Sequence, residues 1–222
     1  MSPLLHATLW PAMQAQAPGR GDSPALRFEG QQTSYAQLAA QACGIAAALC
    51  ARGVQRGDRV AWLGLNHPLQ IALLLACAGI GAIAMPLNYR LAKPELARML
   101  NDASPSLLLH DLAWQDMAQT LGTSHTIQTQ TFEALLREGG ALPAVDMARG
   151  RSEDAVLLVY TSGTSGLPKG AVHTQRNLCQ NMQLVGTNAA LIAADLIATV
   201  LPLFHVGGLC IQTLPALGWA LV

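Results

Sequence analysis

The sequence predicts an α/β fold with three layers, in which a mostly parallel sheet is flanked by helices. Short apolar segments at residues 58–64, 82–86, 107–110 and 155–160 alternate with longer helical segments. Strands that are apolar on both faces are typical of parallel sheets covered by helices. The chain is also unusually apolar, because 51% of the residues are hydrophobic and the mean hydropathy is +0.31, which indicates either a very large core or a surface that is normally buried against a partner.

Residues typical of helix N-termini predict where the first two helices begin. Ser34 and Gln37 have capping-box spacing, and the alanine-rich run after them ends at Gly53, which predicts a helix over residues 35–52. Residues 58–64 form the first expected strand of the sheet. Asn66 is the expected N-cap of the next helix, and Pro68 is tolerated in its first turn.

The next elements follow the same alternation. Residues 82–86 are expected to form a strand, residues 95–101 to lie in a helix, and residues 107–110 to form another strand. Between residues 122 and 154 the pattern becomes polar. This segment is expected to be a surface excursion or linker, with one short helical piece near residues 132–138.

The last third returns to regular structure. Residues 155–160 are expected to form a strand, residues 169–173 a second strand, and Thr174 the cap of a helix. This helix has an apolar face formed by Leu178, Met182, Val185 and Ala189. Residues 196–201 are expected to be a strand, and residues 202–205 a turn into Gly207 and Gly208.

One uncharged apolar run, residues 68–87, is long enough to span a bilayer. Gly79, Gly81 and Pro86 interrupt its second half, however, and a strand-like segment follows the glycines. A buried helix that leads into a buried strand is therefore expected, and no transmembrane segment.

Charge and cysteine content limit the partners and the compartment. The formal net charge is zero, so neither nucleic acid nor an anionic membrane is an expected partner. The five cysteines form no CxxC pair, which favours reduced thiols and a cytoplasmic location. The first residues have no basic region followed by an apolar core, so no signal peptide is expected.

The stretch VYTSGTSGLPKGAVHT, residues 159–174, contains the strongest functional signal. It places four hydroxyl side chains, two glycines and one lysine in a single loop after a buried strand. Backbone N–H groups, hydroxyls and a cation are the donors that a polyphosphate requires, whereas a simple polar turn between two strands is the alternative. The Walker pattern GxxxxGK[ST] does not fit, so the phosphate would be held by a hairpin and not by a helix N-terminus.

These residues carry a resemblance. The segment YTSGTSGLPKG, residues 160–170, resembles the signature loop of the adenylate-forming (AMP-binding) superfamily, which includes acyl-CoA synthetases, firefly luciferase and peptide-synthetase adenylation domains. LPLFHVGGL, residues 201–209, is similar to the next motif of that family. The order of TSY, GDRVAWLGLN and MPLNYRL before them also matches, so the resemblance covers nearly the whole chain.

The resemblance implies an acid–CoA ligase that uses ATP, Mg²⁺, CoA and a carboxylic acid. A carboxylate attacks the α-phosphorus of ATP, pyrophosphate leaves, and CoA displaces AMP. The implied catalytic residues are Lys169 and His205, with His205 lining the acyl pocket and Thr161 also contacting the metal ion. The implied phosphate-binding residues are Thr161, Ser162, Gly163, Thr164, Ser165, Gly166 and Lys169.

The resemblance also implies that residues 1–222 are the N-terminal portion of the large AMP-binding domain, and that this portion alone is inactive. Members of the family are roughly twice as long, and their adenine, ribose and second-lysine motifs have no counterpart here. Apolar surface exposed in such a chain would favour a homo-oligomer.

Two alternatives to the ligase remain: a homologue that only binds nucleotide or a partner, and a hydrolase that uses residues 204–209 as an oxyanion loop. The hydrolase lacks a G-x-S-x-G elbow.

Overall fold

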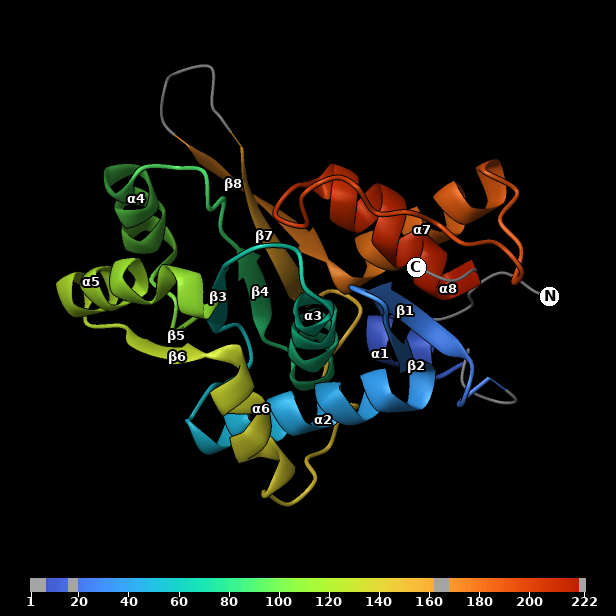
Figure 1. The fold of residues 1–222 in the computed structure, drawn as a ribbon, viewed down its shortest axis with the longest axis horizontal. Helices are drawn as coiled ribbons and strands as arrows, with labels where there is room; N and C mark the ends of the chain where they lie inside the picture. Colours follow the sequence, from blue (N-terminus) through green and yellow to red (C-terminus); the bar gives the residue numbers. More distant parts are fainter. Residues whose placement is uncertain (1–6, 16–19, 162–167, 220–222) are drawn as a thin grey trace.

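A six-stranded sheet forms the centre of the computed structural model, which describes residues 7–15, 20–161 and 168–219. The strand order is β6-β5-β3-β4-β7-β8 (Figure 1). All neighbouring pairs are parallel except β7 with β8, so the sheet is mostly parallel, as expected. The strands are β3 (Arg59–Leu63), β4 (Ile83–Pro86), β5 (Leu107–His110), β6 (Gln128–Thr131), β7 (Ala155–Thr161) and β8 (Lys169–Thr174).

Helices cover both faces of this sheet, and a short hairpin lies outside it. The helices are α1 (Leu9–Gln14), α2 (Tyr35–Ala51), α3 (Pro68–Ile80), α4 (Lys93–Ala103), α5 (Gln115–His125), α6 (Phe132–Gly140), α7 (Gln175–Asn188) and α8 (Leu214–Trp219). A 3₁₀ turn η1 (Leu112–Trp114) and a π-helix η2 (Gly207–Thr213) complete them. The hairpin pairs β1 (Pro24–Phe28) with β2 (Gln31–Ser34), and the sequence analysis did not predict it.

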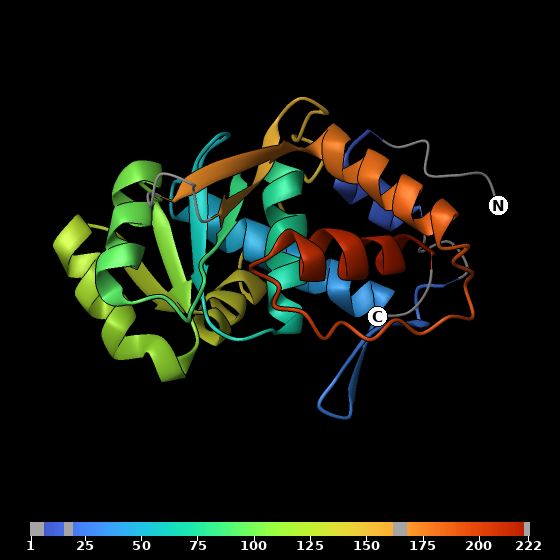
Figure 2. The ribbon, with the colours of Figure 1, turned by 90° about the horizontal axis from the view of Figure 1, so that it is seen from above.

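Two hydrophobic clusters show the three layers directly. In β3, Val60 and Trp62 belong to the larger cluster, with α2, α3 and α6, whereas Ala61 and Leu63 belong to the smaller cluster, with α4 and α5. Figure 2 shows α4 and α5 on one side of the sheet and α2 and α3 on the other. Successive side chains of a strand point to opposite faces, so a strand that is covered on both sides is apolar throughout.

The direction of each crossover explains which face its helix covers. The connections β3 to β4 and β6 to β7 run toward one edge of the sheet and use α3 and α6. The connections β4 to β5 and β5 to β6 run toward the other edge and use α4 and α5. Parallel crossovers are almost always right-handed, so reversing the direction along the sheet moves the helix to the opposite face.

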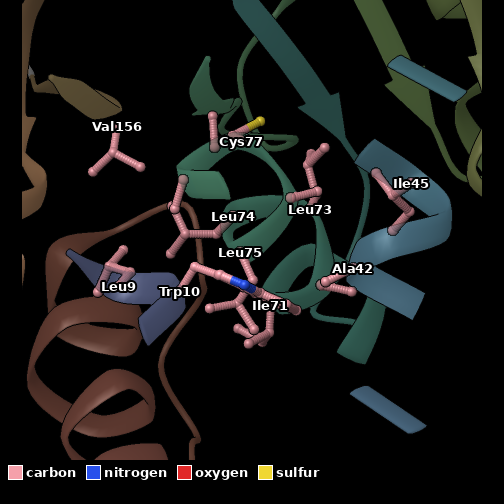
Figure 3. Close-up of a cluster of buried hydrophobic side chains, with 14 of the residues drawn as sticks. Leu9, Trp10, Ala42, Ile45, Ile71, Leu73, Leu74, Leu75, Cys77 and Val156 are labelled. Atoms are coloured by element: carbon pink, nitrogen blue, oxygen red, sulfur yellow. The ribbon is translucent and has the colours of Figure 1, made fainter. Parts of the chain in front are cut away.

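Helix α3 lies at the centre of the larger cluster, where its side chains meet α1, α2 and β7 (Figure 3). Eleven of its residues are buried, which explains the long apolar run in the sequence. Gly81 ends the helix with φ +82°, a left-handed conformation that favours glycine, and β4 follows. The prediction of a buried helix followed by a strand is confirmed, and no helix in the described ranges is long and apolar enough to cross a membrane.

The predicted caps have different outcomes. The capping box of Ser34 and Gln37 is present at α2, and Thr174 caps α7. The prediction for Asn66 was wrong: the N-cap of α3 is His67, whose ring nitrogen Nδ1 accepts a hydrogen bond from the Leu69 amide. The side chain of Asn66 instead bonds the distant segment 201–203.

The prediction of a surface excursion or linker over residues 122–154 was only partly correct. The predicted short helical piece is α6, and residues 141–154 form neither helix nor strand, but the segment before α6 contains regular structure. Helix α5 continues to His125, and β6 then joins the sheet by pairing with β5. This strand has the sequence QTQT and is at the edge of the sheet, so backbone hydrogen bonds hold it in place without an apolar pattern.

Residues 196–201 do not form the predicted strand. They contain one isolated bridge at Leu196. Side chains satisfy part of this backbone instead, because Gln212 accepts from the Leu201 amide and Asn66 bonds on either side of Pro202. The predicted turn at 202–205 is confirmed, with the His205 amide donating to the Pro202 carbonyl at 3.1 Å.

Candidate functional site

Strands β7 and β8 form the antiparallel hairpin that carries the predicted phosphate loop. Thr161 ends β7 and Lys169 begins β8, and the two residues are opposite each other in the ladder. The Thr161 hydroxyl donates to the Lys169 carbonyl at 3.5 Å, and both residues are exposed. The predicted ligands Ser162, Gly163, Thr164, Ser165 and Gly166 lie outside the described residues.

A cavity of about 240 Å³, here called the hairpin cavity, lies beside this hairpin. Tyr160 and Thr161 come from the carboxyl end of β7, and Pro86 comes from the carboxyl end of β4. Crevices at the carboxyl ends of parallel strands are the usual ligand sites of open α/β sheets. Its described lining consists of Pro86, Asn88, Leu91, Glu95, Arg98, Met99, Tyr160, Thr161, Pro168, Phe204 and His205.

The hairpin cavity brings together two of the predicted site residues that are far apart in the sequence. Thr161 and His205 both line it, whereas Lys169 is not among its described lining residues. His205 is exposed and its ring lies 4.6 Å from the ring of the buried Phe204. A hydroxyl and an imidazole therefore face one space that a small polar ligand can enter.

The π-helix η2 explains why residue 208 is a glycine. The first residues of η2 pack against the backbone of Leu201 and Pro202. A Cβ on Gly208 would lie 2.5 Å from the Pro202 carbonyl oxygen and 2.6 Å from that of Leu201. Only glycine permits this approach. π-Helical turns are rare and are frequent at functional sites.

An aromatic cluster supports the ring of Phe204. Tyr89 is edge-on to Phe204 at 5.3 Å and to Trp114 at 5.5 Å. The Arg90 guanidinium lies over Tyr89 at 5.5 Å and over Phe204 at 5.9 Å. The segment after β4 therefore contacts the residue that precedes His205. The sequence analysis used MPLNYRL only as a matching motif and did not assign it this role.

Tyr160 connects the hairpin to α4. Its hydroxyl donates to the Asp102 carboxylate at 2.6 Å. Burial, and then this bond, raise the pKa of the Tyr160 phenol above its usual value, so the phenol keeps its proton to a higher pH than a free tyrosine does. This bond fixes the end of β7, one residue before Thr161, against the helix that forms the opposite wall of the cavity.

Asn66 is a second site-related residue whose position was not predicted. Its Oδ1 accepts from the Leu203 amide at 2.8 Å, and its Nδ2 donates to the Leu201 carbonyl at 3.0 Å. The two bonds hold the segment that leads to His205 against the loop after β3. No local sequence signal indicates such a partner, because 137 residues separate Asn66 and Leu203.

The thiol that follows the turn at His205 is buried. Cys210 is the nearest thiol to the histidine in the sequence, and burial raises its pKa to about 11, which leaves it protonated and unreactive. Within residues 7–15, 20–161 and 168–219, no group of three or more His, Cys, Asp and Glu could hold a metal ion.

Comparison with known proteins agrees with this geometry. The family model described as AMP-binding enzyme matches residues 13–221. The chain is 43% identical over 205 residues to an indoleacetate–CoA ligase of Aromatoleum aromaticum, covering 87% of this chain and 40% of that protein. It is 35% identical over 210 residues to a feruloyl-CoA synthase of an Amycolatopsis species, covering 94% and 41%. The chain thus spans about two fifths of the length of these relatives.

Solved structures show the same fold. ATP-bound MatB from Rhodopseudomonas palustris superposes with a TM-score of 0.88 at 26% identity, covering 98% of this chain and 45% of that one. An anthranilate–CoA ligase, AuaEII, in complex with anthranoyl-AMP also has a TM-score of 0.88, at 22% identity, covering 100% and 45%. The family match covers nearly the whole chain, and the fold and the hairpin agree with it: the chain belongs to the AMP-binding enzyme family.

Proposed function

We propose that residues 1–222 are the N-terminal portion of the large domain of an ATP-dependent acid–CoA ligase. The complete protein adenylates a carboxylic acid, releases pyrophosphate and then forms a thioester with CoA. The observation that carries this proposal is the hairpin cavity, where Thr161, at the base of the signature loop, and His205 line one space. The relatives named above are acid–CoA ligases by name.

The described residues fit a nucleotide phosphate chain. Thr161 and Lys169 are the two ends of the loop, both exposed, and they supply a hydroxyl and an ammonium group. We assign phosphate binding to Thr161, Ser162, Gly163, Thr164, Ser165, Gly166 and Lys169. Hydrogen bonds from such donors to charged phosphate oxygens are short and strong. The same donors also stabilise charge that develops at a transferring phosphate.

Thr161 would be one of several oxygen ligands of Mg²⁺ at such a site. Magnesium that accompanies a nucleotide takes most of its oxygen ligands from phosphate and water. Thr161 supplies one oxygen at the edge of the hairpin cavity, which is compatible with the role proposed for it. When bound, the ion would neutralise phosphate charge.

The acid substrate would lie on the His205 side of the cavity. Phe204 and Tyr160 give this space aromatic edges. Indoleacetate and ferulate, the acids named for two relatives, both carry an aromatic ring. Aromatic acids are therefore the first acids to test, followed by the long-chain fatty acids named for others.

Acid-dependent pyrophosphate exchange tests the proposed function. We expect no exchange by residues 1–222, because groups that act as a unit in catalysis fail together when part of the unit is missing. A protein extended to the length of the relatives should exchange pyrophosphate and then acylate CoA. Binding of ATP without pyrophosphate exchange at either length would favour the alternative that the protein only binds nucleotide. Absence of both ATP binding and pyrophosphate exchange at both lengths would contradict the proposed ligase function.

Location and assembly complete the proposal. The five cysteines are all free thiols, which supports a cytoplasmic protein. The large hydrophobic side chains that remain exposed on this chain support self-association.

A further inference from the structure

One wall of the hairpin cavity belongs to α4, and this wall carries a cation. Glu95, Arg98 and Met99 are the α4 residues that line the cavity. None of them was among the site residues expected from the sequence. Apart from the imidazole of His205, Arg98 is the only basic side chain in the described lining of the hairpin cavity.

Among the described residues, only one nitrogen of the Arg98 guanidinium donates a hydrogen bond. Its Nε donates to the Pro94 carbonyl at 3.3 Å, within the helix. The carboxylates in the described part of the chain form ion pairs with Arg52, Arg56 and Arg176 but not with Arg98. The remaining N–H groups of its guanidinium are therefore available for a ligand in the cavity, and they match phosphate oxygens in geometry.

The turn of α4 that carries Arg98 has a fixed position relative to the carboxyl end of β7. The Tyr160 hydroxyl bonds Asp102 at 2.6 Å and approaches the Met99 carbonyl at 3.4 Å. Met99 is adjacent to Arg98, and Tyr160 is adjacent to Thr161. The side chain of Arg98 thus lines the same cavity as the base of the phosphate loop, from a different helix.

Glu95 lines the same wall and bears the opposite charge, but it is already engaged. Its Oε2 accepts from the Ala92 amide at 2.9 Å, which places the carboxylate at the N-terminus of α4. A carboxylate in that position is stabilised by the helix dipole and by the amide that it accepts from. Arg98 lies three residues further along α4, adjacent in sequence to Met99, whose carbonyl the Tyr160 hydroxyl approaches.

We propose that Arg98 binds the terminal phosphates of the nucleotide, and the departing pyrophosphate, in the hairpin cavity that it lines together with Thr161. This inference rests on the proposed function. Arg98 supplies a cation that is independent of Lys169, since it comes from α4 and not from the hairpin. It binds the group that leaves, so it discriminates ligands that contain β- and γ-phosphates from AMP.

The test is a titration of the chain with inorganic pyrophosphate and with AMP, by calorimetry and by the amide shift of Thr161. Arg98→Gln should weaken pyrophosphate binding about fivefold, which corresponds to about 1 kcal/mol. AMP binding should change by less than about twofold, because AMP has no terminal phosphates to lose contact with. Arg98→Lys should give an intermediate value, since it keeps the charge and loses the planar fork.

Lys93→Gln is the matched control, because Lys93 is an exposed cation on the same helix that is not among the described lining residues. It should leave pyrophosphate binding unchanged. An equal loss of pyrophosphate affinity in Arg98→Gln and Lys93→Gln would show that only long-range electrostatics acts, and it would overturn the proposal. Normal pyrophosphate binding by Arg98→Gln would overturn the role of Arg98 alone. Failure of the unmodified chain to bind pyrophosphate would overturn this role together with the phosphate site of the proposed function.

Discussion

Asn66 and Leu203 are joined by a 2.8 Å hydrogen bond from the Leu203 amide to the Asn66 side chain. The same side chain donates to the Leu201 carbonyl at 3.0 Å. One asparagine in the loop after β3 therefore holds both sides of Pro202, and Pro202 in turn accepts the amide of His205. Through these bonds Asn66 fixes where the imidazole enters the hairpin cavity.

The first prediction concerns this contact. Asn66→Ala removes both bonds and leaves the part-buried Leu203 amide without its partner, whereas the exposed Leu201 carbonyl can bond water instead. We expect a loss of about 1–3 kcal/mol in the free energy of unfolding, together with shifted amide resonances from Leu203 to His205. Urea denaturation and amide spectra measure the two effects. Asn101→Ala, at an exposed position of α4, should change neither, and unshifted resonances in Asn66→Ala would refute the positioning role.

The second prediction concerns Gln175, a fully buried polar residue at the start of α7. Its Oε1 accepts from the Leu9 amide at 3.0 Å, and its Nε2 donates to the Ala78 carbonyl at 2.9 Å. It thus connects α1, α3 and α7. Gln175→Ala should cost about 2–4 kcal/mol, because it leaves two buried backbone groups unpaired and creates a cavity.

Gln180→Ala is the control for Gln175, since Gln180 is exposed on the same helix. Chemical denaturation of both variants at equal protein concentration gives the comparison. Equal stability of the two variants would show that the contacts of Gln175 contribute nothing net.

The third prediction is a pH dependence that Tyr160 causes. The folded state raises the pKa of this phenol above its ordinary value of 10.0, mainly through burial and then through the bond to Asp102. The folded chain therefore keeps the proton at a pH where the unfolded chain releases it. Stability from this group is complete below pH 10 and is lost progressively as the pH rises above 10.

Tyr160→Phe should lower stability by about 1 kcal/mol at pH 8, where the hydrogen bond is lost, and should flatten the decline above pH 10. Tyr35 also has a raised pKa, so the difference between the wild type and the variant is the informative quantity. Asp102→Asn keeps an acceptor and removes the charge, so its decline should be intermediate. Urea midpoints between pH 8 and pH 10.5 measure this, and parallel curves for wild type and Tyr160→Phe would contradict it.

The fourth prediction concerns self-association. Most of the exposed large hydrophobic side chains lie between residues 184 and 211, and Val200 is 77% exposed. We expect a dimer or larger species, because apolar surface is buried between copies of the chain. Val200→Ser combined with Ile211→Ser should shift the sedimentation equilibrium toward monomer. Leu112→Ser, which alters an equally exposed residue in η1, should not, and a concentration-independent wild-type monomer would refute the prediction.

Local sequence signals determined much of this fold. Three features depend only on neighbouring residues, so they can be predicted without the rest of the chain. They are the capping box at Ser34, the cap at Thr174 and the pairing of the strands 155–161 and 169–174. The apolar run over α3 and β4 was likewise predictable, because a helix inside a core needs no polar face. The resemblance of the loop gave the family, and through it the two residues Thr161 and His205 that line the hairpin cavity.

The tertiary structure alone decided the contacts between distant segments. Asn66 is a good N-cap residue by type, yet the fold uses its amide to bond residues 201–203, and His67 takes the cap. The polar strand β6 exists because β5 offers a backbone edge, which no side-chain pattern in QTQT indicates. Arg98 has no motif of its own, and it reaches the cavity only because the crossover from β4 to β5 places α4 opposite the hairpin. Periodicity and caps are local properties, whereas a site that lies between a helix and a hairpin depends on how the sheet brings them together.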